Sequence, residues 1–143
     1  MPPLADEFPA APERSPLLWA ALGGVPGLDT VRGLGLFDGQ AELYLRVLRR
    51  FAETYRDGVP ALVSNGDEAP GGPAAAAHSL RGAAGAIGAT TIERAAGRLQ
   101  ALAEGEAADA DAGAATEARA LQGALVALAR RLDAILGPVD TPR

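Results

Sequence analysis

Apolar residues recur every three or four positions along most of the chain, whereas no segment alternates for long enough to predict a strand. The clearest case is the segment 40–58, whose amphipathic pattern predicts a helix ending near Gly58. One face of this helix is apolar and consists of Tyr44, Val47, Leu48, Phe51 and Tyr55. Three close arginines, Arg46, Arg49 and Arg50, point elsewhere, and we interpret them as a solvated face rather than a phosphate-binding patch.

Two further helices are predicted in the middle of the chain. The first begins around Pro70 to Pro73, because proline is well accepted in a first helical turn, and runs to about Ala89. The second begins with Thr90 or Thr91 as its cap. Its apolar side chains share one face and are Ile92, Ala95, Leu99 and Leu102.

The last predicted helix spans roughly residues 115–136 and stops at Gly137 and Pro138. Its apolar positions alternate between spacings of three and four, which is typical of the seam of a helical bundle. These positions are Ala118, Leu121, Leu125, Leu128, Leu132 and Ile135. The acidic, small-residue stretch before this helix is predicted to be a loop.

The N-terminal part has a different character. Residues 1–16 contain five prolines and too few apolar residues to fold alone, which predicts a tail or linker. A short helical turn is predicted at residues 17–22, where we expect Trp19 to anchor on the bundle. Asp29 is a candidate N-cap for another short helix that ends near Gly39.

Four substantial helices, each with one apolar stripe, predict an all-α fold. We expect an antiparallel four-helix bundle with an additional short N-terminal helix. The folded domain is predicted to span residues 17–137, between a disordered or linker-like tail at 1–16 and a C-terminal tail at 138–143.

Composition limits the chemistry. The chain lacks cysteine, which excludes disulfides and cysteine nucleophiles, and its single histidine excludes a multi-histidine metal site. A net charge of -5 without a basic cluster argues against nucleic acid as a partner. No apolar run approaches the ~18 residues of a membrane span, and the N-terminus lacks the pattern of a signal peptide. We therefore expect a cytoplasmic protein without direct membrane contact.

The single histidine, His78, lies in the segment AAAAHSLRGAAGAIGA, in which three glycines follow it. Each glycine inside a helix costs about 1 kcal/mol relative to alanine. A helical wheel places Leu80, Ala84 and Ile87 opposite His78, so the imidazole is expected to face solvent. Within about 60° of it, everything but one arginine is small. These neighbours are Arg81, Gly82, Gly85, Ala89, Ala74 and Ala75.

Two interpretations of this face compete. A lone surface histidine often has no role, and glycines often allow two helices of one fold to approach closely. However, glycines packed on a neighbouring helix would bury His78 as well and would expose Leu80 and Ile87. We therefore favour a flat face that admits a group from outside.

The local motif supplies no second histidine, cysteine or adjacent carboxylate, so the usual partners of a hydrolase are missing. An imidazole can still act as a nucleophile near neutral pH and accept a phosphoryl group. Such a carrier needs no catalytic groups of its own if its partners supply acid, metal and geometry. A group of acidic residues downstream is interpreted as solvated charge rather than a metal site: Glu104, Glu106, Asp109 and Asp111.

The segment AHSLRGAAGAIGA, residues 77–89, resembles the signature of histidine-containing phosphotransfer (HPt) domains of bacterial two-component phosphorelays. That signature reads His-x-Leu-Lys-Gly, then small residues, then Gly-Ala. Over residues 25–136 the resemblance is weaker. It implies a histidine phosphocarrier that accepts a phosphoryl group from a receiver-domain aspartate or a kinase and passes it to a response-regulator aspartate. It also implies no independent catalytic activity, no cofactor of its own, and magnesium supplied by the partner receiver domain.

Carried over by position, the resemblance makes His78 the phosphoacceptor and Leu80 the core residue behind it. Arg81 replaces the usual lysine; both can steady phosphoryl oxygens, but the guanidinium is forked and longer. Gly82 matches the glycine that leaves room for the receiver's active site. Gln100 matches a position on the next helix whose side chain can hydrogen-bond one imidazole nitrogen and so orient the other.

Later in the motif, Gly88 and Ala89 match the Gly-Ala pair, and Gly85 fits the small-residue stretch. The alternative function is a helical docking module of the same fold that binds a receiver or kinase domain without being phosphorylated. The intact His-x-Leu-Arg-Gly run favours the carrier. No long exposed apolar stripe requires a dimer, so we expect a monomer.

Overall fold

The computed structural model describes residues 10–63, 72–105 and 110–137. These residues form six α-helices and one short 3-10 helix: α2 (Ala10–Gly23), α3 (Thr30–Leu36), α4 (Ala41–Tyr55), η1 (Pro60–Val63), α5 (Gly72–Ile87), α6 (Thr90–Glu104) and α7 (Ala110–Leu136). Within them the only β pairing is an isolated bridge between Leu28 and Ala89. The prediction of an all-α fold is confirmed.

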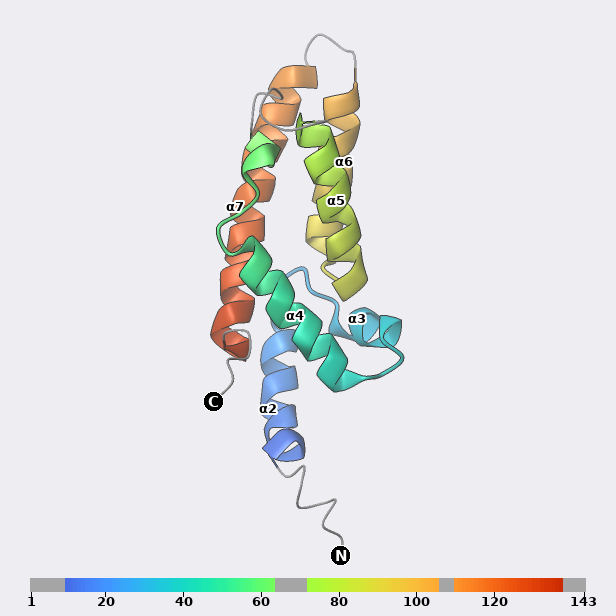
Figure 1. The fold of residues 1–143 in the computed structure, drawn as a ribbon, viewed down its shortest axis with the longest axis vertical. Helices are drawn as coiled ribbons and strands as arrows, with labels where there is room; N and C mark the ends of the chain where they lie inside the picture. Colours follow the sequence, from blue (N-terminus) through green and yellow to red (C-terminus); the bar gives the residue numbers. More distant parts are fainter. Residues whose placement is uncertain (1–9, 64–71, 106–109, 138–143) are drawn as a thin grey trace, which may run out of the picture.

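Helices α4 to α7 form a helical bundle in which successive helices run in alternating directions (Figure 1). The tightest pair is the hairpin of α5 and α6, and α6 also packs on α7. Helix α4 crosses obliquely and lies mainly on α7, while η1, which follows it, contacts both α5 and α7. Helix α4 and η1 together therefore occupy the place of the fourth helix of the bundle. The sequence pattern does not predict this division into two helices.

Most residues of the stripes predicted from the apolar spacing lie in the core of the bundle, whereas Val47, Tyr55, Leu102 and Ile135 are half-buried. Tyr44, Leu48 and Phe51 of α4 are buried, as are Ile92, Ala95 and Leu99 of α6. The seam of α7 is buried at Ala118, Leu121, Leu125, Leu128 and Leu132. Burial of these stripes supplies the main favourable term in folding.

Of the two N-terminal helices, α2 is longer than expected, and α3 ends at Leu36, before the expected end near Gly39. Helix α2 begins at Ala10, so the part of segment 1–16 that the structure describes is helical; residues 1–9 and 138–143 lie outside the described residues. Trp19 is half-buried, and its ring stacks on that of Tyr44 with centroids 6.2 Å apart. Asp29 caps α3 as predicted, accepting a 3.0 Å hydrogen bond from the backbone N–H of Arg32.

Helix α5 ends at Ile87, two residues before the predicted end. Gly88 has φ +80, a left-handed conformation that favours glycine, and a Cβ there would collide with the carbonyl of Asp29. The N–H of Asp29 in turn donates a 2.7 Å hydrogen bond to the carbonyl of Gly88. Gly88 is thus a turn residue that ends α5 against the α2–α3 connection, not a glycine inside the helix.

Helix α7 begins at Ala110, earlier than the predicted residue 115, and so includes part of the acidic stretch predicted as a loop. Its C-terminus follows the prediction, because Gly137 has φ +80 and its N–H donates to the carbonyl of Asp133. None of the described helices has the length and apolarity needed to cross a membrane.

Candidate functional site

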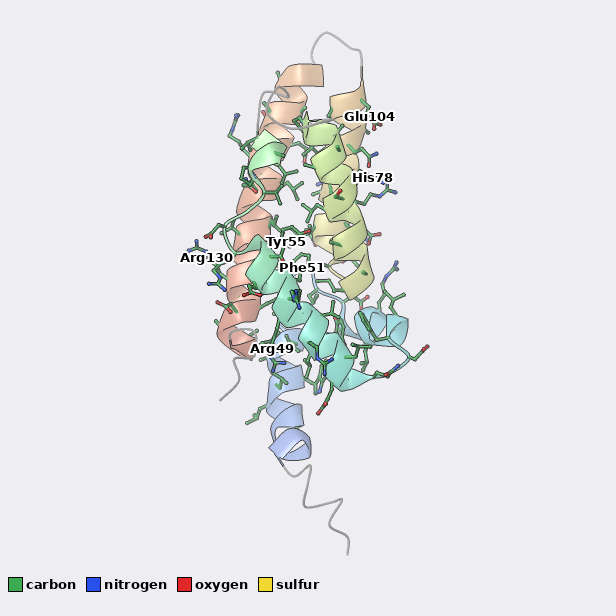
Figure 2. All side chains as sticks on the ribbon, in the orientation of Figure 1. Arg49, Phe51, Tyr55, His78, Glu104 and Arg130 are labelled. Atoms are coloured by element: carbon green, nitrogen blue, oxygen red, sulfur yellow. The ribbon has the colours of Figure 1, made fainter. Side chains whose placement is uncertain are left out.

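His78 lies on the outer side of α5, turned away from α7 (Figure 2). Its side chain is exposed, whereas Ala77, Leu80 and Ala84 of the same helix are buried. The imidazole makes no hydrogen bond or ion pair with any described residue. The imidazole is therefore exposed and has no hydrogen-bond partner among the described residues.

An exposed strip of mostly small residues runs along α5 on both sides of the histidine: Ala75, His78, Ser79, Gly82 and Ala86. At Gly82 an added Cβ would meet nothing within 4 Å, so this part of the face is open. Ser79 and Ala86 were not among the predicted site residues. They lie about 100° and 80° from His78 on a helical wheel, just outside the window used for the prediction.

The predicted face of small residues around His78 is wrong at its C-terminal end. Ala89 is fully buried because α5 has already ended, and its backbone forms the N-cap of α6. Ala74 and Gly85 are half-buried. A Cβ at Gly85 would lie 2.9 Å from Oε2 of Glu93, so a carboxylate from α6 covers this glycine. The face is therefore open at His78 and Gly82, covered by Glu93 at Gly85, and closed at Ala89.

Arg81 is exposed and extends across to α6. Its Nε lies 3.7 Å from the position that a Cβ on Gly97 would occupy. The glycine at position 97 thus leaves room for the arginine side chain to lie across the neighbouring helix. Arg81 thus lies one turn from His78 on α5, and its long side chain extends to α6.

Gln100 does not form the predicted bond to the imidazole in this arrangement. Its Nε2 instead donates a 3.3 Å hydrogen bond to Oε2 of Glu104, one turn further along α6. Its Oε1 is buried and has no hydrogen-bond partner. Leaving a buried acceptor without a partner costs about 1–3 kcal/mol of stability. This oxygen is therefore available to accept a hydrogen bond from an N–H donor.

A hollow of about 310 Å³ adjoins the strip on the side of α4 and η1. It is lined by Tyr55, Val59, Ala75, Ser79 and Leu80, among others. Burial raises the pKa of Tyr55, which keeps its hydroxyl neutral over a wider pH range. The hollow is a partly apolar recess beside the exposed strip of α5.

The acidic stretch does not gather into a metal site in the part of the chain that the structure describes. Glu104 is engaged with Gln100, and Glu106 and Asp109 lie outside the described residues. Asp111 lies in the first turn of α7, but its side chain is not described.

Comparison with known proteins gives one match. The family model of the Hpt domain matches residues 43–136, which is more than half of the chain. No curated protein and no solved structure matches significantly. The matched segment begins at the start of α4 and ends with the last residue of α7, so it coincides with the bundle and leaves out α2 and α3.

Proposed function

The chain belongs to the Hpt domain family, and we propose on this basis that His78 is the residue that carries the phosphoryl group. Membership of the family gives the chain a role in phosphotransfer within two-component signalling. The observation that supports His78 as the carrier is its exposure on a helix face that is open as far as Gly82. A second protein can approach this imidazole without meeting a side chain larger than serine along the strip.

The proposed reaction is a direct transfer from an aspartyl phosphate of a receiver domain. The unprotonated nitrogen of a neutral imidazole attacks phosphorus, and an N–P bond forms as the P–O bond to the aspartate breaks. The aspartate leaves as a carboxylate with the bonding electron pair. The proton on the other ring nitrogen stays in place, so the phosphorylated ring carries a positive charge. Onward transfer to a response-regulator aspartate is the same step in reverse.

Two neighbouring side chains have proposed roles in this step. Arg81, one turn from His78, supplies a cation that can hydrogen-bond the phosphoryl oxygens. Gln100 is proposed to accept a hydrogen bond from the imidazole N–H through its unpartnered Oε1. That bond strengthens as the ring becomes positive, which favours the phosphorylated state.

The partners proposed for this role are the receiver domain of a hybrid kinase and the receiver of a response regulator. The chain is proposed to act in the cytoplasm as a monomer and without catalytic activity of its own. Any magnesium ion needed to neutralise the phosphoryl oxygens is proposed to be held by the partner receiver rather than by this chain.

Incubation of the full chain with a phosphorylated receiver domain, or with a kinase and ATP, tests the proposal. We expect label on the protein that acid removes and alkali leaves in place, and we expect His78→Ala to abolish it. Circular dichroism of the variant controls for folding. Retained binding without any label from competent donors would instead support a docking module that is not phosphorylated.

A further inference from the structure

A second and larger hollow, of about 550 Å³, lies where α3, α5 and α6 meet, beside the face that carries His78. Its charged lining residues are four arginines and one glutamate: Arg32, Arg81, Arg94, Arg98 and Glu93. All four arginines are exposed. On a chain with a net charge of -5, this is a local concentration of positive charge.

The described residues leave most of this charge unneutralised. Arg98 forms an ion pair with Glu117, in which its Nε lies 3.6 Å from Oε2. Arg32, Arg81 and Arg94 form no ion pair with any residue that the structure describes. The carboxylate of Glu93 lies against Gly85 at the α5 side of the hollow. The hollow therefore presents guanidinium groups to solvent.

The position of the hollow makes it part of any interface centred on His78. Arg81 lies one turn from the histidine, and the lining residues of α6 extend from Thr90 to Arg98, over about 12 Å of helix. A stable protein interface covers about 800 Å² on each partner. A protein that reaches the imidazole therefore also covers some of these arginines.

The exposure of the arginines favours a protein over a small molecule as the occupant. Pockets for small molecules enclose most of the ligand surface, whereas exposed charges around an interface steer and select protein partners. We propose that this arginine-lined hollow docks an acidic projection of the partner receiver, a loop or helix end bearing carboxylates, and that it selects among receivers by charge. The proposal rests on the function proposed above, because it takes the partner to be a receiver domain.

The test compares two double charge reversals with the same change in net charge. R32E/R94E reverses two unpaired arginines of the hollow and leaves Arg81 in place. R119E/R131E reverses two exposed arginines of α7, which are likewise unpaired within the described residues. Binding of the full chain to a panel of purified receiver domains is measured by titration calorimetry without a phosphoryl donor, over a range of salt concentrations.

For a receiver that binds the wild type, we expect R32E/R94E to weaken binding about tenfold or more at low salt and to flatten the salt dependence. R119E/R131E should bind as the wild type does. Reversal of the acidic residues on that receiver to lysine should restore binding to R32E/R94E. Equal binding by R32E/R94E and R119E/R131E would overturn the proposal. So would saturable binding of inorganic phosphate in the hollow that leaves receiver binding unchanged, because the site would then serve small anions.

The outcomes also separate this proposal from the proposed function. Arginine-dependent binding without phosphorylation of His78 would remove the carrier function and leave the docking site intact. Phosphorylation of His78 at the wild-type rate in R32E/R94E, with unchanged receiver binding, would remove the docking site and leave the carrier function intact.

Discussion

The hydroxyl of Tyr44 donates a 2.7 Å hydrogen bond to the carbonyl of Ile87, the last residue of the helix that carries His78. The bond is buried and joins residues that are 43 positions apart in the chain. It satisfies one of the last carbonyls of α5, which have no partner within the helix. Gly33 permits this contact, because a Cβ there would collide with both the Tyr44 hydroxyl and the Ile87 carbonyl. Helix α4 thus fixes the C-terminal end of α5.

Tyr44→Phe should lower the free energy of unfolding by about 1–2 kcal/mol, because it leaves the Ile87 carbonyl buried without its donor. Urea denaturation measures this loss. Tyr55→Phe is the matched control: its hydroxyl makes no hydrogen bond with the described residues, and the change should cost much less. Equal losses in both variants would show that the bond to Ile87 contributes little.

The raised pKa of Tyr44 leads us to expect that the fold loses stability in alkali. Burial, and secondarily the charge of Asp29, raises the pKa of Tyr44 from 10.0 to about 12. Because the pKa is higher in the folded state, the stabilisation is complete below pH 10.0 and is lost as the pH rises towards about 12. Urea denaturation at several pH values should show this decline, with a shallower decline in Tyr44→Phe. Tyr55 contributes in the same direction, so some decline should remain.

Gly88→Ala should destabilise the protein more than Gly137→Ala does. Both glycines have φ +80, so alanine at either position carries backbone strain of about 1–2 kcal/mol. At Gly137 the added Cβ meets nothing within 4 Å, whereas at Gly88 it meets the carbonyl of Asp29 and the backbone of Gly33. A larger fall in melting temperature for Gly88→Ala than for Gly137→Ala is the expected sign of this collision. Similar melting temperatures would contradict the close approach at Gly88.

Gly82→Leu should slow phosphotransfer at least about tenfold while leaving the helix intact or more stable, because leucine favours the helix by about 0.8 kcal/mol over glycine. The matched control is Gly123→Leu in α7. Both glycines lie inside helices, are exposed, and have nothing within 4 Å of an added Cβ. Only Gly82 lies beside His78, so only its replacement should obstruct a partner. An unchanged transfer rate in folded Gly82→Leu would contradict the open-face interpretation.

Local sequence patterns predict much of this fold and site. Apolar spacing identifies the buried stripes of α4, α6 and α7, and the helical wheel gives the outward direction of His78. The pattern misplaces Ala89, because the end of α5 is determined at Gly88 by a contact with Asp29, far away in the sequence. Such a contact leaves no periodic signal.

The arginine-lined hollow likewise could not be predicted from local sequence patterns. Its arginines come from α3, α5 and α6, and the packing of these helices brings together Arg32, Arg81, Arg94 and Arg98. No short window of the sequence contains these four arginines together, and the overall charge of -5 points the other way. Nor does the pattern show that Glu93 covers Gly85, since this depends on the register between α5 and α6.

The proposed role of Gln100 gives a final prediction. If its Oε1 accepts a hydrogen bond from the imidazole of His78, Gln100→Leu should slow transfer about tenfold, which is the lower end of the loss seen when a metal-binding histidine loses its orienting partner. Gln100→Glu should restore the rate, because a carboxylate also accepts. The two ring-nitrogen shifts of His78 in NMR spectra should report a single favoured tautomer in the wild type and a mixture in Gln100→Leu.

The control for this prediction is Glu104→Ala, which removes the present partner of the Gln100 amide without touching its free oxygen. If the amide is held in place mainly by Glu104, the variant should loosen it and reduce the tautomer preference only in part. A tautomer ratio that is the same in the wild type and in Gln100→Leu would exclude an orienting bond. The buried oxygen of Gln100 would then be only an unsatisfied acceptor, and the orientation of the imidazole would have to come from the partner.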